Sequence, residues 1–160
     1  DSSMKINIIV AMDEQNGIGK NNQIPWKSKD DFAHFKTTTL GFPVLMGRNT
    51  WESLPRKPLA QRKNIVVSSR KDIELCDQLI DSPDKADEDE LFAIGGVSIY
   101  EWAVKNKDLN IIYITHVCGS YSADVHFPTI DLSSWNSEEI GKIVKNETNN
   151  IDARIVKYWR

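Results

Sequence analysis

Short apolar runs rich in β-branched residues recur along the whole chain, and they constrain its fold more than any other feature. Several of them lack polar alternation, which is typical of strands covered on both faces. Helical patterns lie between them. The expected strands are Ile6–Met12, Pro43–Met46, Asn64–Ser68, Cys76–Ile80, Leu91–Ile94 and Asn110–Val117, and the expected helices are Ser28–Thr39, Arg48–Leu54 and Val97–Lys105. This alternation predicts an α/β fold with a mostly parallel central sheet and helices on both faces.

The last part of the chain has a different pattern. Trp135–Glu147 and Asp152–Trp159 are expected to be two further strands, joined by a hairpin around Asn146–Ile151. They would add an antiparallel edge to the sheet. The acidic stretch Asp81–Glu90 could hold a short helix or only a loop.

The size and charge of the chain narrow the classes of function. Its 160 residues predict a single domain spanning 1–160, with Asp1–Ser3 left out of the fold argument because they precede Met4. The chain has 20 basic and 23 acidic residues, a net charge of -3. This balance removes the usual electrostatic basis for binding nucleic acid or a membrane surface. We therefore expect neither as a partner.

The chain shows no signal peptide and no apolar stretch of membrane-spanning length, so a cytoplasmic location is expected. Cys76 and Cys118 form no CxxC pair, and no His/Cys cluster has the spacing of a zinc site. We expect two buried, inert thiols, with a disulfide possible but not indicated, and no metal site.

Two junctions between a strand and a helix carry glycines, Gly47 after Val44–Met46 and Gly95-Gly96 after Phe92–Ile94. A helix start offers unpaired N–H groups, and glycine lets a phosphate approach them closely. Two such junctions suit a ligand with two phosphates, although glycines at these positions can also simply turn the chain. The third glycine of a dinucleotide fingerprint and the P-loop motif are both missing.

Asp31 is a candidate functional carboxylate, because it lies one turn before Phe35 on the apolar face of its helix. Burial against aromatic rings would raise its pKa. The favoured alternative from the residues alone is that Asp31 completes a capping box opened by Ser28. The long polar segment Asp13–Lys27 is either a mobile lid or a plain connector.

These pieces occur in an order that resembles the dihydrofolate reductase family, over about Lys5 to Trp159. The blocks that carry the resemblance are 16–20 (NGIGK), 24–26 (IPW), Asp31 with Phe35, 43–54 (PVLMGRNTWESL), 62–69 (RKNIVVSS), 94–100 (IGGVSIY), 114–116 (ITH) and 124–128 (DVHFP). The resemblance is to the short bacterial or phage-type form. It implies an eight-stranded sheet with four or fewer helices and a cleft across it.

The resemblance also implies the reaction. Dihydrofolate would be reduced to tetrahydrofolate by hydride transfer from NADPH to C6 and protonation at N5, in support of thymidylate and purine synthesis. The protein would act as a monomer and would bind antifolates as well as dihydrofolate. A catalytic group would comprise Asp31, tied by Thr115, and Trp26, which would help to hold a water.

The remaining expected roles follow from the same resemblance. The substrate pocket would be lined by Ile9, Val10, Ala11, Asp31, Phe32, Phe35, Leu54, Ile94 and Thr115, with Arg62 on the glutamate tail. The cofactor would meet Ala11, Ile18, Gly19, Gly47, Arg48, Asn49, Thr50, Val67, Ser68, Ser69, Arg70, Ile94, Gly95, Gly96, Val97, Ser98, Ile99 and Tyr100, with a cis peptide between the paired glycines. Ile24 and Asp124 would couple the lid to a second loop.

Some positions depart from the family pattern. Val97 replaces a third glycine and Ser98 a common basic residue, so cofactor affinity is expected to depend more on Arg48 and Arg70. Two alternatives remain at this point. One is an NADPH-dependent pyrimidine reductase of riboflavin synthesis with the same frame, and the other is an inactive homologue that only binds ligands.

Overall fold

The computed structural model describes residues 4–21 and 23–160, and strands alternate with helices along it. Asp1–Ser3 and Asn22 lie outside the described residues. The strands are β1 (Lys5–Met12), β2 (Gly17–Gly19), β3 (Val44–Gly47), β4 (Asn64–Val67), β5 (Gln78–Ile80), β6 (Glu90–Ala93), β7 (Leu109–Val117), β8 (Val125–His126), β9 (Asn136–Ile143) and β10 (Ala153–Trp159). The helices are α1 (Lys29–Thr39), α2 (Arg48–Ser53), α3 (Val97–Val104) and the 3₁₀-helix η1 (Pro83–Lys85).

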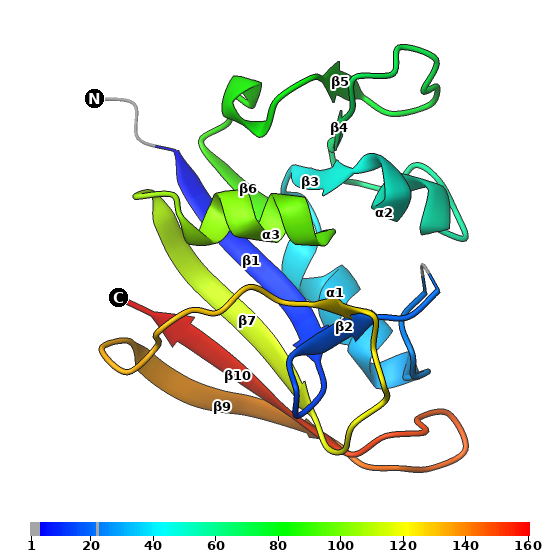
Figure 1. Ribbon diagram of the computed structural model, residues 1–160, viewed down its shortest axis with the longest axis vertical. Helices are drawn as coiled ribbons and strands as arrows, with labels where there is room; N and C mark the ends of the chain where they lie inside the picture. Colours follow the sequence, from blue (N-terminus) through cyan, green and yellow to red (C-terminus); the bar gives the residue numbers. More distant parts are fainter. Residues whose placement is uncertain (1–3, 22) are drawn as a thin grey trace.

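Eight strands form one sheet in the order β5-β4-β3-β6-β1-β7-β10-β9 (Figure 1). Neighbouring strands from β5 to β7 are parallel, whereas β10 is antiparallel to both β7 and β9. The predicted α/β fold with an antiparallel C-terminal hairpin is therefore confirmed. β1 lies between β6 and β7, so neither of its edges is free, and five consecutive residues from Ile6 to Val10 are buried, as its continuous apolar sequence predicts.

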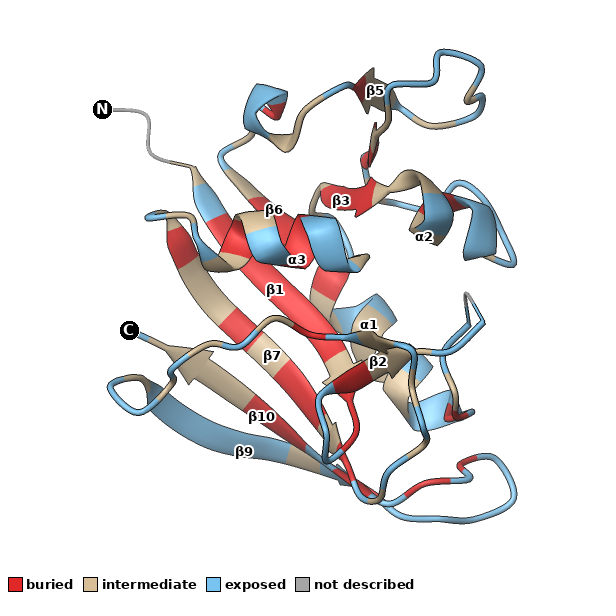
Figure 2. Cartoon of the chain, in the orientation of Figure 1, coloured by how far each residue is buried: buried red, intermediate tan, exposed pale blue. Residues whose placement is uncertain are grey.

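The helices cover opposite faces of this sheet. Ile99, Tyr100 and Ala103 of α3 pack with Ile6 and Ile8 in one apolar cluster. On the other face a second cluster joins side chains of the helices and of the strands. Phe35 of α1, Trp51 of α2 and Leu54 at the end of α2 pack there with Ile9 of β1 and Val44 of β3. Figure 1 shows α3 in front of β1 and α1 behind it, and Figure 2 shows the buried residues concentrated on the central strands.

The structure corrects some details of the sequence prediction. The segment after β1 contains β2, which pairs with β8 in a separate two-stranded sheet. Strands this short carry no recognisable periodicity. The stretch Asp81–Glu90 holds only η1. Cys118 is exposed and Cys76 only partly buried, so the expectation of two buried thiols was wrong; both are free. Cys118 comes just after the last residue of β7, where the buried strand ends.

No helix of the described residues is long and apolar enough to cross a membrane.

The start of α1 is held by the loop between β9 and β10. Asn149, fully buried, accepts hydrogen bonds from the Ser28 hydroxyl at 2.7 Å and the Asp30 N–H at 3.1 Å. Its own amide donates to Asp30 Oδ2 at 2.9 Å. The Ser28 hydroxyl also caps the helix by accepting from the Asp31 N–H at 3.1 Å. A distant loop therefore sets where α1 begins.

We expect the Asn149→Ala substitution to destabilise the protein by about 2–3 kcal/mol, because it leaves buried polar partners of α1 unpaired. Thermal denaturation measures the effect. The matched control is Asn136→Ala at the exposed start of β9, which is expected to change stability by less than about 0.5 kcal/mol. Equal stability of the two variants would contradict this role of Asn149.

Candidate functional site

The carboxyl ends of four neighbouring parallel strands meet at one edge of the sheet. These strands are, in spatial order, β4, β3, β6 and β1. The segments that follow them are, in the same order, residues 68–70, 48–50, 94–98 and 13–16. Ligands of open α/β sheets bind outside the carboxyl ends of the strands. The sequence-predicted cofactor residues come from this edge, so the fold brings together positions that are far apart in the chain.

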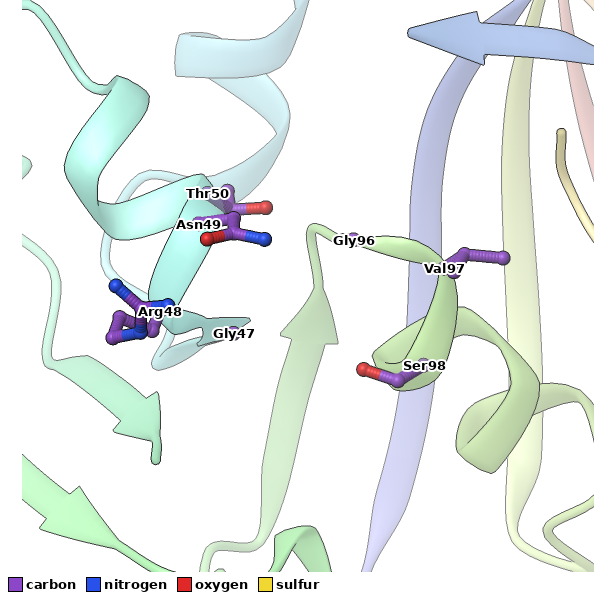
Figure 3. A pocket seen from close by; sticks show the side chains of 7 residues that line it. All are labelled: Gly47, Arg48, Asn49, Thr50, Gly96, Val97 and Ser98. Atoms are coloured by element: carbon purple, nitrogen blue, oxygen red, sulfur yellow. The ribbon is translucent and has the colours of Figure 1, made fainter. Parts of the chain in front are cut away.

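Between the N-termini of α2 and α3 lies a hollow of about 200 Å³. It is lined by Gly47, Arg48, Asn49, Thr50, Gly96, Val97 and Ser98 (Figure 3). Both helices have a glycine as N-cap, and neither N-cap makes a side-chain hydrogen bond. The peptide bond between Gly95 and Gly96 is cis, as the resemblance implies.

This hollow fits an anionic group. The first N–H groups of two helices face it without a capping side chain, and both helix dipoles place their positive ends there. A Cβ added to Gly96 would make an ordinary contact with Thr50 Oγ1 at 3.8 Å, so the two helix starts lie close together across the hollow. In Figure 3 the Asn49 and Thr50 side chains point toward Gly96. These residues could hold the diphosphate of a dinucleotide.

A second hollow of about 420 Å³ follows the ends of β4 and β5. Its lining residues are Ser68, Ser69, Arg70, Lys71, Leu79, Ile80, Asp81 and Lys85. Val67, the last residue of β4, pairs in register with Gly47 of β3. The second hollow is therefore one strand away from the first, as the two ends of one dinucleotide require.

Asp31 belongs to the first turn of α1, and its side chain meets β7. Thr115 Oγ1 donates a hydrogen bond to Asp31 Oδ1 at 2.9 Å. Burial raises the pKa of Asp31, and the hydrogen bond from Thr115 opposes that shift only in part. Ala11 of β1 pairs directly with Thr115, so the carboxylate lies at the centre of the sheet. The capping-box alternative fails, because the Asp31 carboxylate bonds to Thr115 while only its backbone N–H meets Ser28.

An apolar wall accompanies the carboxylate on the same face of the sheet. Ile9 belongs to the cluster of that face, and Phe35, Leu54 and Ile94 pack against it. Phe32 is 61% exposed, so it stands at the rim and not inside the wall. Val10 is a correction to the predicted lining: its side chain packs with α3 on the opposite face, because successive residues of a strand alternate.

Arg62 is placed next to this wall. Its guanidinium lies 5.9 Å from the Phe35 ring centroid, and Nη1 donates to Thr39 Oγ1 at 3.1 Å. Nε donates to the Ala60 carbonyl at 2.9 Å. Partial burial lowers the pKa of Arg62 slightly below its usual range, which leaves it a cation. A positive charge is thus fixed at the C-terminal end of α1, whereas Asp31 lies at the N-terminal end of the same helix.

The two α3 residues at the end of the predicted set, Ile99 and Tyr100, are buried. The Tyr100 hydroxyl donates to the Ile9 carbonyl at 3.0 Å, which ties α3 to the strand beside the site. Val97 is 37% exposed at the start of the same helix. Tyr100 and Ile99 therefore support the helix terminus from beneath.

The loop after β1 reaches over this region. Asp124 donates its N–H to the Gly19 carbonyl at 2.9 Å and accepts the Asn21 N–H on Oδ2 at 3.1 Å. Ile18 packs against the cluster of α3, and Ile24 is 54% exposed. Trp26 closes the loop, and its buried indole N–H has no partner among the described residues. It is free to donate to a water or ligand.

Sequence reasoning missed Asp13. This buried carboxylate accepts the N–H groups of Gln15 at 2.9 Å, Gly17 at 2.8 Å and Tyr121 at 3.0 Å. Desolvation opposes ionisation, but these hydrogen bonds outweigh it and lower the pKa of Asp13. A Cβ at Gly17 would meet Ala123 at 2.5 Å, so the two loops require glycine there. An acidic residue at a strand end, four positions before a glycine, was the available signal.

Comparison with known proteins agrees with this geometry. Residues 5–160 match the family model described as dihydrofolate reductase. Dihydrofolate reductase of Bacillus subtilis is 37% identical over 159 residues, covering 96% of this chain and 93% of its own. The dihydrofolate reductase of Neisseria gonorrhoeae is 42% identical over 152 residues, which cover 85% of this chain and 86% of that protein. The solved dihydrofolate reductase from Enterococcus faecalis complexed with NADP(H) and RAB-propyl superposes with a TM-score of 0.84 at 27% identity, covering 99% of this chain and 97% of that one.

We expect Asp31→Asn to raise the melting temperature at neutral pH. Burial raises the pKa of Asp31 above that of a solvated carboxyl group, so the native state binds more protons than the unfolded state between the two pKa values. The stability of the parent protein therefore falls as pH rises through that range, and the neutral amide avoids this loss. Thermal scans from pH 3 to 8 should show the two proteins converging in acid. A lower melting temperature of the variant at pH 7 would contradict the buried carboxylate.

Proposed function

The chain belongs to the dihydrofolate reductase family, and we propose that it reduces 7,8-dihydrofolate to 5,6,7,8-tetrahydrofolate, with the carboxylate of Asp31 as the group that holds the ring to be reduced. NADPH, when bound, supplies the hydride to C6, while N5 takes up a proton, so that the N5–C6 double bond is reduced. The observation that carries the proposal is the Asp31 carboxylate, half-buried on Thr115 beside an apolar wall.

Asp31 recognises the pterin ring. A carboxylate accepts two parallel hydrogen bonds, here from N3–H and the 2-amino group of dihydrofolate. Thr115 occupies Oδ1 with a single hydrogen bond, so acceptor capacity remains on both oxygens. Holding the ring by this edge favours the electron distribution in which N5 accepts a proton. The partnerless N–H of Trp26 is suited to holding a water close by.

The apolar wall and Arg62 hold the rest of the substrate. Ile9, Phe35, Leu54 and Ile94 offer a dry slot for the pterin and aminobenzoyl rings, with Phe32 at its exposed rim. Arg62 binds the α-carboxylate of the glutamate tail, since a planar guanidinium meets a carboxylate with two hydrogen bonds. The Thr39 and Phe35 contacts orient Arg62 before the substrate arrives.

The strand edge holds the dinucleotide. The two uncapped helix starts take the diphosphate, and Ala11 and Ile18 flank the nicotinamide. Ser68, Ser69 and Arg70, together with Arg48, take the adenosine and its 2′-phosphate at the second hollow. The positive ends of α2 and α3 favour these anionic groups.

We further propose that the protein acts as a monomer in the cytoplasm without a nucleic-acid partner, and that antifolates compete for the Asp31 pocket. The net charge of -3 and the two free thiols support these assignments. The pyrimidine reductase alternative is not favoured, because the matched family model and relatives are dihydrofolate reductases.

The loss of NADPH absorbance on adding dihydrofolate, with and without an antifolate, tests the activity directly. Asp31→Asn should keep the fold and lower kcat near neutral pH by about 100-fold or more, because the ring loses its charged acceptor. The control is Asp87→Asn, which changes an exposed carboxylate in the loop between η1 and β6. A near-normal rate for the Asp31 variant would refute the assignment, and no turnover by the parent would revive the inactive-homologue alternative.

Arg62→Leu should raise KM for dihydrofolate by about 10-fold to 100-fold with little change in kcat, since a charge-assisted contact to a remote part of the substrate is lost. Arg56→Leu, an exposed arginine in the same connecting segment, is the matched control. Steady-state kinetics separate the two constants. An unchanged KM would show that Arg62 does not meet the substrate.

A further inference from the structure

Three basic residues that line the second hollow or stand beside it are each paired with an acidic neighbour. Arg70 Nε and Nη2 donate to the two carboxylate oxygens of Asp72 at 3.0 Å and 2.6 Å. Arg48 Nη1 donates to both oxygens of Glu52, one turn further along α2, at 3.1 Å and 3.2 Å. Lys85 Nζ lies 2.7 Å from Asp81 Oδ1. Lys71 also lines this hollow, so the three pairs reduce the positive charge at this end of the strand edge without removing it.

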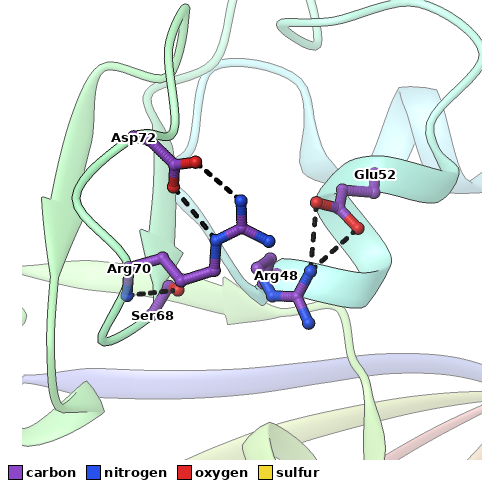
Figure 4. Close-up of polar contacts among 5 residues, drawn as sticks. All are labelled: Arg48, Glu52, Ser68, Arg70 and Asp72. Carbon is purple, nitrogen blue, oxygen red and sulfur yellow. Dashed lines mark hydrogen bonds and ion pairs between the residues drawn. The ribbon is translucent and has the colours of Figure 1, made fainter.

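The two arginine pairs form one group of charges. In Figure 4 the guanidinium groups lie between the carboxylates of Asp72 and Glu52. The pairs also influence each other: Asp72 raises the pKa of Arg70, mainly through their hydrogen bonds, and Glu52 adds to that effect. Arg70 lowers the pKa of Asp72 in the same way, and Arg48 contributes. Two arginines therefore stand beside two carboxylates, and the formal charges of the four side chains balance within the group.

The carboxylates occupy the same donors that a phosphate would use. A phosphate, like a carboxylate, prefers two parallel hydrogen bonds from one edge of a guanidinium. Asp72 already takes the Nε edge of Arg70, and Glu52 takes Nη1 of Arg48. More than a third of each of these four side chains is exposed, so water screens the pairs and they can exchange partners.

We propose that Asp72 and Glu52 are specificity-determining residues that weaken the binding of the 2′-phosphate. They thereby make the preference of the protein for NADPH over NADH smaller than the two arginines alone would give. The inference rests on the proposed function, in which Arg48 and Arg70 hold that phosphate. A dianionic phosphate entering here meets two carboxylates as well as two arginines, and it must displace at least part of the existing pairing. A dinucleotide without the phosphate leaves all four groups as they are.

Calorimetric binding of adenosine 2′,5′-bisphosphate and adenosine 5′-monophosphate tests this without the chemical step. Asp72→Asn and Glu52→Gln should each raise the affinity for the bisphosphate about threefold or more and leave that for the monophosphate unchanged. The ratio of KM for NADH to KM for NADPH should rise in parallel. The control is Glu139→Gln on the distant strand β9, where the carboxylate is paired with Arg154. This variant should change the affinity for neither nucleotide.

The outcomes separate the inference from the function beneath it. An unchanged or lower affinity of both variants for the bisphosphate overturns the inference, since the carboxylates would then be neutral or would hold the arginines in place for the phosphate. Equal binding of the two nucleotides by the parent protein and by both variants overturns both the phosphate site and the inference. Dihydrofolate reduction by the same parent protein would still establish the activity.

Discussion

The hydrogen bond from Thr115 to Asp31 joins β7 to α1, and the arrangement of the proposed substrate half of the site depends on it. It keeps a carboxylate against apolar side chains where burial alone disfavours its charge. The contact holds because Asn149 and Ser28 fix the start of α1 independently. Burial of this carboxylate lowers the stability of the folded state, a cost that is common at functional sites.

The second half of the site follows from parallel strand order. Since β4, β3, β6 and β1 run in the same direction, their following loops meet at one edge and present two helix N-termini to one hollow. At this edge the backbone supplies the positive potential, because the nearby arginines are already paired with carboxylates. Affinity for a dinucleotide can thus come from the backbone, while selection among dinucleotides depends on side-chain charges.

Several features could be read from the chain alone. Continuous β-branched runs identified the buried strands, and Gly47 and Gly95-Gly96 marked the helix starts at the hollow. The two-stranded sheet of β2 and β8 escaped detection, since a strand of two or three residues has no period. Val10 and Cys118 were misplaced because apolar character does not reveal which face of a strand is used or where burial ends.

The sequence by itself determined the fold class, the order along the chain of the helices and of the strands of the main sheet, and the residue types available at each junction, because these depend on local periodicity and glycine. Only the tertiary structure decided that Asp31 bonds to Thr115 and not to its own helix cap, and that Asp72 and Glu52 meet the two arginines. The physical reason is that a carboxylate will accept from any donor within about 3 Å. Which donor comes that close is set by packing between distant segments.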